Sequence, residues 1–308
     1  MNNNTKIKKK KRKSGDRTWF ILFATIPPLI NFLIFYVYIN ASAFFRAFFD
    51  SEGNPSLLNF VKIVNEFQKE TSDLSIALKN TLLTFAIILI SYPFKVLVSY
   101  FIYKKVPFYN FYRVVFFLPM IIFSVCINLS FQRMIGPSGP IAQFVSDWMN
   151  LDYVPELLAD SRFANTVVIL HMLWLGFPGD LIIWGGTFAR IPDEVLESGR
   201  IDGTTWWTEF TKITIPLVWP TLTLQMVMMF AALFSSSGAV FLLTGGNYGT
   251  QTLASWLYIY LLNNSRSFGG ENTYNFLSAV GLVITALAVT ISMTVRKISS
   301  KFNNDIEF

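Results

Sequence analysis

The sequence is poor in charge, in cysteine and in histidine. Only 14% of its 308 residues are charged, whereas a soluble domain carries about a quarter. Cys126 and His171 are the single residues of their kinds, which excludes a disulfide framework, a cysteine-based zinc site and a cluster of several histidines. Apolar residues make up 53% of the chain, with 31 phenylalanines, and they come in long blocks. This pattern excludes an ordinary soluble enzyme, a disordered chain and a coiled coil, and it predicts an integral membrane protein.

Six of the apolar blocks are long enough to cross a bilayer. A helix that spans the hydrocarbon needs about 20 apolar residues. Backbone groups in lipid must be hydrogen-bonded internally, and these blocks are too long for barrel strands, so they are expected to be helices. The sequence therefore predicts an all-α integral membrane protein with six transmembrane helices. Their expected ranges are 18–40, 81–103, 114–135, 163–189, 217–243 and 274–295.

Basic residues fix the expected orientation. If the N-terminus is cytoplasmic, most of the 25 Lys and Arg residues fall on the cytoplasmic side, so the positive-inside rule places both termini there. Residues 1–17 are then a basic cytoplasmic tail, 18–300 the transmembrane domain and 301–308 a second cytoplasmic tail. We interpret the basic tail as a topology determinant near anionic lipid, with no nucleic-acid partner. The expected location is the plasma (inner) membrane of a prokaryote, as a multi-pass protein.

The segment 191–216, between the fourth and fifth predicted spans, reads as two short helices lying across the cytoplasmic mouth. Pro192 suits the first helical position. Gly203 can adopt the left-handed conformation that ends a helix, and Thr204 or Thr205 can cap the next one. The second helix carries one apolar stripe of Trp206, Phe210 and Ile213. We interpret the acids of the segment as helix-end charges plus a docking motif; they are Asp193, Glu194, Glu197, Asp202 and Glu209.

This segment resembles the EAA loop of ABC importer permeases. The spacing of Glu197-Ser-Gly199, Gly203 and Ile213-x-Ile-Pro216 matches it, although the family usually has Ala-Ala where this chain has Ser-Gly. Both substitutions are small, so a close helix approach is expected to survive them. The resemblance implies that 191–216 is a coupling loop, which docks into a groove on a cytoplasmic ATPase subunit. The residues it assigns to this coupling are Glu197, Ser198, Gly199, Asp202, Gly203, Ile213 and Pro216.

Further motifs strengthen the resemblance. They are Asn80-Thr81, Phe111-Tyr-Arg-x-x-x-Phe-Leu-Pro119, Ile191-Pro192 and Leu243-Thr-Gly-Gly246, the last followed by Asn247 where the family has proline. Together they resemble the carbohydrate-type permeases, specifically the maltose-permease-like first subunit of a heterodimer. The implied fold is the ABC type I importer permease fold. The implied partners are a second homologous permease subunit, two cytoplasmic ABC ATPase subunits, an extracytoplasmic solute-binding protein and the lipid bilayer.

The sequence contains no G-x-x-x-x-G-K-[ST] phosphate-binding loop. We therefore expect a non-enzymatic transporter subunit, without a cofactor or a metal of its own. ATP and Mg would be bound by the partner subunits. Alternating access would follow if closure of the ATPase dimer pushed the coupling loop, in a rigid-body rotation of the packed helices.

The expected solute path runs along the fourth and fifth spans. Trp174-Leu-Gly-Phe177 is similar to a stretch that contributes to the sugar site of maltose-type permeases, so Trp174, Leu175, Gly176 and Phe177 are assigned to the path. Lys95 and Asp180 are charges within spans, which need shelter because an unpaired one costs at least about 3 kcal/mol. They either pair, or Asp180 lines the cavity. Ser235 and Ser236 contact the solute or pack helices.

Other functions stay open at this point. The shared motifs do not report the cargo, so a permease for another solute, such as a glycerol phosphate, is one alternative. A membrane-embedded transferase is another, and it would need paired acids or a histidine dyad near the interface. A permease is expected to co-purify with an ATPase subunit and with a second, homologous permease, which separates these alternatives.

Overall fold

We describe a computed structural model of the chain, covering residues 14–50, 52–69, 72–237, 240–264 and 270–302. Within these ranges the regular structure is helical, apart from one isolated antiparallel bridge between Phe49 and Pro55. Four helices are long and apolar enough to cross a membrane unbroken, and two bent helix pairs pass the same test when each is taken together. The all-α prediction is confirmed.

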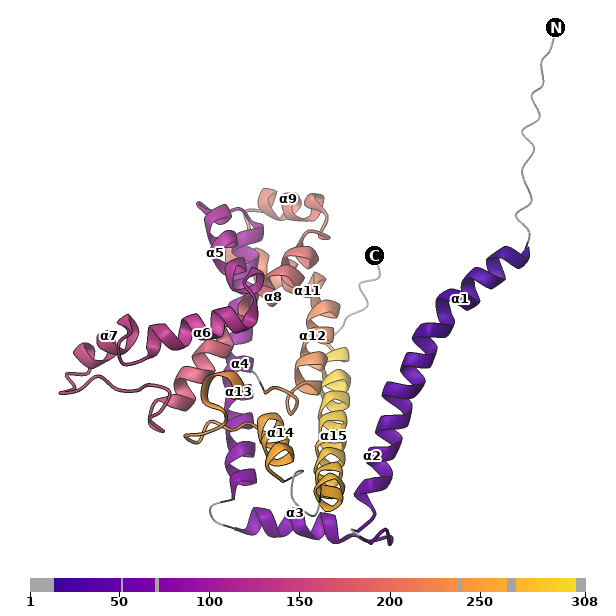
Figure 1. Ribbon diagram of the computed structural model, residues 1–308. Helices are drawn as coiled ribbons and strands as arrows, with labels where there is room; N and C mark the ends of the chain where they lie inside the picture. Colours follow the sequence, from indigo (N-terminus) through magenta and orange to yellow (C-terminus); the bar gives the residue numbers. More distant parts are fainter. Residues whose placement is uncertain (1–13, 51, 70–71, 238–239, 265–269, 303–308) are drawn as a thin grey trace.

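The long helices form a bundle (Figure 1). The second and fourth predicted spans are α4 (Asp73–Tyr103) and α8 (Ala164–Phe188), which pack along each other. The sixth is α15 (Gly270–Ser300), which packs on α12 (Trp219–Ala231). The first comprises α1 (Ser14–Phe32), the π-helical turn η1 (Leu33–Tyr38) and α2 (Ile39–Ala47).

The third and fifth predicted spans differ from straight helices. The expectation of one helix over 114–135 is wrong, because α5 (Tyr109–Ile121) and α6 (Ser124–Ile135) are separated by two extended residues and the chain bends by 105° between them. Pro119 removes a backbone donor from the last turn of α5, which weakens the helix at this point. In the fifth, α12 ends at Ala231, well before residue 243, and a bend of 73° separates it from the preceding helical segment.

Short helices cover both ends of the bundle. At one end α9 (Asp193–Ile201) lies crosswise, followed by α10 (Trp206–Thr208), the π-helical turn η2 (Glu209–Thr214) and α11 (Ile215–Leu217). At the other end α3 (Leu58–Gln68) lies crosswise beneath α4 and α15. Above it α14 (Leu253–Asn264) packs on α4 and α15, and α13 (Val240–Thr244) packs on α6 and α8. The short helix α7 (Pro140–Trp148) extends the arm that begins with α6 (Figure 1).

The first span leaves the bundle. Figure 1 shows α2 beside the foot of α15 and α1 diverging from it. None of the most apolar stretch of Trp19–Ala47 is buried against the rest of the chain. Soluble monomers rarely expose continuous apolar patches above a few hundred Å², so this helix needs lipid or another protein around it.

Two large apolar clusters hold the bundle together. One joins α2, α3, α4, α14 and α15 around Leu74, Trp256 and Phe276. The other lies beneath α9 and η2, where Tyr100, Trp184 and Phe188 are almost completely buried. The second cluster therefore gives the 191–216 segment a firm base on α4 and α8.

Candidate solute cavity and coupling loop

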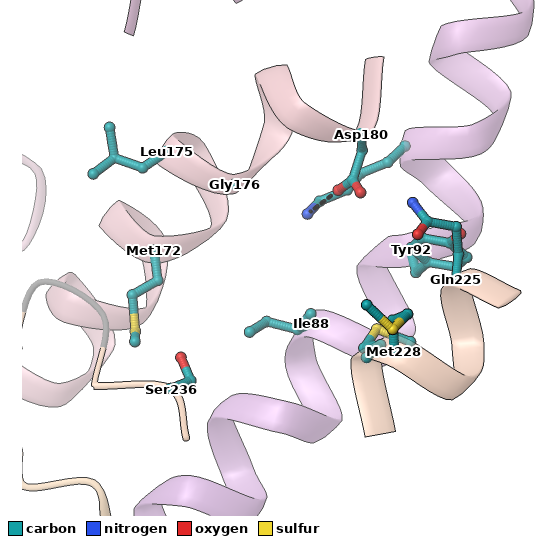
Figure 2. A pocket seen from close by; sticks show the side chains of 11 residues that line it. Ile88, Tyr92, Met172, Leu175, Gly176, Asp180, Gln225, Met228 and Ser236 are labelled. Carbon is teal, nitrogen blue, oxygen red and sulfur yellow. Dashed lines mark hydrogen bonds and ion pairs between the residues drawn. The ribbon is translucent and has the colours of Figure 1, made fainter. Parts of the chain in front are cut away.

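A cavity of about 470 Å³ opens where α4, α8 and α12 meet. Figure 2 shows the side chains of these three helices arranged around it. Its lining combines methionine and aliphatic surface with a phenol, an amide, a hydroxyl and an ion pair. The lining residues are Ile88, Tyr92 and Lys95 of α4, Met172, Leu175, Gly176 and Asp180 of α8, Gln225, Met228 and Met229 of α12, and Ser236.

The two charges predicted to need shelter form an ion pair on the cavity wall. Lys95 Nζ donates to Asp180 Oδ2 at 2.8 Å (Figure 2, dashed line). The lysine side chain is 6% exposed and that of the aspartate 20%. Both alternatives read from the sequence hold, because the residues pair and Asp180 also lines the cavity. The carboxylate, rather than the ammonium, is the more accessible member of the pair.

The structure separates the residues predicted for the solute path into two groups. Leu175, Gly176, Asp180 and Ser236 line the cavity. The others lie outside that lining. Trp174 makes an edge-to-face contact with His171 and a tilted contact with Phe131. Phe177 packs on Phe116 of α5 with ring centroids 4.8 Å apart. Ser235 is exposed after α12, where it donates to the carbonyl of Ala232.

Sequence reasoning missed the lining contributed by Tyr92 and Gln225. Gln225 lies in an apolar span, where an amide side chain needs a polar partner or water, and that signal was available. Tyr92 gives no such signal, because a tyrosine in a membrane helix is common. Its place in the cavity follows from the packing of α4 against α8.

The 191–216 segment has the predicted helix–turn–helix start. Pro192 precedes α9 in an extended conformation, Gly203 has a φ of 74°, and the side chain of Thr205 accepts a hydrogen bond from the Thr208 backbone N–H. Gly203 therefore takes the left-handed conformation that ends α9. The predictions for Gly203 and the threonine cap are confirmed, with Thr205 rather than Thr204 as the cap, but Pro192 lies one residue before the first helical position.

One face of α9 rests on the bundle and the other is free. Leu196 and Gly199 are buried, whereas Glu197, Ser198 and Asp202 are exposed. At position 199 an added Cβ would lie 2.8 Å from the Cδ1 atom of Ile213, so the glycine permits the close approach of α9 and η2. The expectation that a small residue here allows α9 and η2 to approach closely agrees with this geometry. Pro216 lies within α11, just before the bend into α12.

The outer face of the segment is apolar as well as acidic. Ile201 is 86% exposed at the end of α9, and Trp206 and Trp207 are each about half exposed. The predicted stripe is thus only partly right, because Phe210 is buried while Trp206 faces largely outward. Exposed large apolar residues next to acids mark a surface suited to contact with another protein.

Glu209 corrects the interpretation of the acids. It is 4% exposed and lies at the start of η2, where its Oε1 atom accepts a hydrogen bond from Tyr100 OH at 2.9 Å and forms an ion pair with Lys104. A π-helical turn places one extra residue in the turn, and here it brings Glu209, Phe210 and Thr214 to the buried side together. Glu209 is therefore a buried anchor rather than a solvated helix-end charge.

The motif residues at the opposite end of the bundle hold a loop in place. Asn80 donates to the carbonyls of Gly249 and Gln251, at 2.6 and 3.0 Å, and Thr81 Oγ1 accepts from the Leu253 backbone N–H at 2.8 Å. Thr244 and Thr250 share a buried hydrogen bond within that loop. Hydrogen bonds thus join the two sequence motifs, at 80–81 and at 243–252, to each other.

Comparison with known proteins gives relatives of one kind. The chain is 24% identical to the multiple sugar-binding transport system permease protein MsmF of Streptococcus mutans, covering 94% of this chain and 98% of the relative. It is 27% identical to the osmoprotective compounds uptake permease protein GgtC of Synechocystis sp., covering 87% and 95%. The maltose/maltodextrin permease protein MalF of Vibrio parahaemolyticus is 30% identical, but the chain spans only 36% of its length. No protein-family model matches the chain.

Solved structures agree on the fold. A bacterial ABC transporter involved in the import of the acidic polysaccharide alginate matches with a TM-score of 0.78 at 22% identity, over 94% of this chain and 98% of that one. A second match, with a TM-score of 0.76, is the same kind of transporter in complex with an alginate pentasaccharide-bound periplasmic protein. The chain thus has the fold of an ABC importer permease. Most of the relatives, among them MsmF and MalF, are sugar-transport permeases, so the resemblance read from the motifs is confirmed.

Proposed function

We propose that this chain is the membrane-spanning permease subunit of an ATP-driven, binding-protein-dependent importer for a sugar or oligosaccharide. It forms half of the translocation path and works by alternating access. The observation that carries the proposal is the presence of two features in one bundle. They are a cavity between α4, α8 and α12 with polar groups on a largely apolar wall, and an exposed crosswise helix, α9, anchored at one end of the bundle.

The chemistry of the cavity supports an uncharged, hydroxyl-rich solute. A phenol, an amide and a hydroxyl from Tyr92, Gln225 and Ser236 can donate to or accept from sugar hydroxyls. Within the described lining, the only cationic side chain is that of Lys95, and Asp180 neutralises it. A glycerol phosphate would need an available cation on this wall, so the pairing favours a neutral sugar over an anionic solute.

The orientation and the spans complete the proposal. We infer that each bent pair crosses the membrane once, which gives six spans, and that both termini are cytoplasmic. The indole of Trp219, at the start of α12, donates to the carbonyl of Ser299, so α15 ends beside the coupling loop. In Figure 1 α1 also begins toward that end. The basic residues at 6–13 and 296–301 would then face the cytoplasm with α9, in a prokaryotic plasma membrane.

The partners follow from the surfaces left free. The coupling residues Glu197, Ser198 and Asp202, with Ile201 beside them, would dock on one of two ABC ATPase subunits, which bind ATP and Mg. A second homologous permease subunit would close the cavity, which is open on this chain alone, and an extracytoplasmic binding protein would deliver the solute at the α3 end. This chain would carry no nucleotide site of its own.

The test is co-purification followed by transport. A tagged chain, expressed with its gene neighbours, is expected to retain an ATPase subunit and a second permease in detergent. Proteoliposomes that hold the complex are then expected to accumulate neutral oligosaccharides only under two conditions. ATP must be present on the side of the membrane that carries the ATPase subunits, and the binding protein must be present on the other side. Uptake by the chain alone, or group transfer to lipid without ATP hydrolysis, would refute the proposal.

A further inference from the structure

The coupling loop is tied to the bundle by a buried cluster of three polar side chains. Glu209 of η2 accepts a hydrogen bond from Tyr100 of α4 and pairs with Lys104, the residue directly after α4. The ammonium of Lys104 also lies 5.7 Å from the centroid of the Tyr100 ring. We refer to Glu209, Tyr100 and Lys104 as the latch.

The apolar surroundings make the latch strong and fix its position. The Tyr100 ring packs on Phe210 and Phe188, with centroids 4.9 and 6.0 Å apart. Away from water, a charge-assisted hydrogen bond is worth about twice a neutral one. A buried carboxylate also cannot leave its partners without a large desolvation penalty. Movement of η2 away from the end of α4 is therefore strongly opposed.

The latch lies on the same stretch of helix as the ion pair at the cavity. Lys95 precedes Lys104 by nine residues, which is about 13 Å of helical rise. Both follow Pro93, whose ring removes the hydrogen bond to the carbonyl four residues earlier and so loosens α4 at that level. The part of α4 after Pro93 can therefore move as one unit, with the coupling loop at one end and Lys95 at the other.

We propose that Glu209 is a positioning residue that transmits displacement of the coupling loop to α4, and through Lys95 to the wall of the solute cavity. This inference rests on the proposed function and adds a route for the coupling within this chain. The exposed face of α9 receives the push, the latch passes it to the end of α4, and the pair of Lys95 with Asp180 moves against α8. Glu209 itself touches neither the ATPase nor the solute.

The experiment compares solute moved per ATP hydrolysed in proteoliposomes of the full complex. Glu209→Gln keeps the shape of the side chain but removes its charge, and we expect about a tenfold fall in this ratio, in the usual range of coupling between sites. Asp147→Asn, an exposed acid on α7 outside the coupling loop, is the control and is expected to leave the ratio unchanged. The exchange Glu209→Lys with Lys104→Glu is expected to recover part of the loss.

The readout distinguishes transmission from a merely structural role. If Glu209→Gln assembles and keeps the wild-type ratio, or loses uptake and ATP hydrolysis in equal proportion, the inference is overturned. If that variant does not assemble, Tyr100→Phe decides on the same ratio, because it removes one hydrogen bond and leaves the ion pair. A wild-type complex that shows no ATP-driven uptake would instead refute the proposed function.

Discussion

The ion pair on the cavity wall allows a quantitative test. Asp180→Asn removes the charge that neutralises Lys95 but keeps the side-chain size, and the ammonium stays 6% exposed among apolar neighbours. Removing one partner of a buried pair costs about 3–5 kcal/mol. Because Asp180 is 20% exposed to the cavity, water there offsets part of this cost, and we expect the lower end, about 3 kcal/mol.

Thermal unfolding of the detergent-purified protein measures this cost. A loss of about 3 kcal/mol corresponds to a fall in Tm of about 5 °C or more for a chain of this size. The double variant Lys95→Met with Asp180→Leu removes both charges and is expected to recover most of the loss, since an apolar pair of similar volume replaces a buried ion pair at little cost. Asp147→Asn, on an exposed face of α7, is the control and is expected to be neutral.

Two results would refute this reasoning. An unchanged Tm for Asp180→Asn would mean that water, rather than the carboxylate, stabilises the Lys95 ammonium. An equal fall for the single and double variants would mean that the position is sensitive to any change in packing, and that the charge is not what matters.

Three further predictions concern the loop and the motifs. Gly199→Ala is expected to leave the free energy of unfolding nearly unchanged, because the gain of about 1 kcal/mol in helix propensity offsets a small shift of Ile213. Gly199→Val is expected to lower it by about 1–3 kcal/mol through overpacking. Thermal unfolding measures both variants. Glu197→Ala is expected to reduce the ATPase retained in a pull-down and the ATP-driven uptake, and if both stay at wild-type levels the exposed carboxylate has no docking role. Asn80→Ala is expected to lose about 0.5–1.5 kcal/mol, because it removes two part-buried hydrogen bonds to carbonyls of the 244–253 loop, and proteolysis of that loop is expected to become faster.

Local chemistry explains the parts of the site that were predictable. The end of α9 followed from a glycine that tolerates positive φ, and the start of α10 followed from a threonine that caps it. That Lys95 and Asp180 each need shelter was foreseeable, because an unpaired charge in an apolar span is costly. Only the structure shows that they pair with each other. The serines after α12 were expected to contact the solute or to pack helices; Ser236 lines the cavity, whereas Ser235 donates to the carbonyl of Ala232 beyond the end of α12.

Other features had at most a weak local signal. Pro119 marks a weak point in the helix, but the size of the 105° bend after Ile121 and the burial of Glu209 depend on how neighbouring helices pack. Residues three and four apart share one face of a helix, so Glu209 lies on the same side as Trp206 and Phe210. That it meets Tyr100 and Lys104 there depends on how η2 packs on the end of α4. Likewise Trp174 matched a sequence pattern for the path, yet its ring packs beside His171, outside the cavity lining.

The sequence by itself determined that the chain is a helical membrane protein with a capped, glycine-terminated loop, because hydrophobic length, charge asymmetry and capping act over short stretches of chain. The tertiary structure alone decided which polar groups meet. Lys95 and Asp180 are 85 residues apart, and Tyr100 and Glu209 are 109 apart. Such contacts arise only when helices pack at a particular rotation, and that rotation is a property of the whole bundle rather than of any one segment.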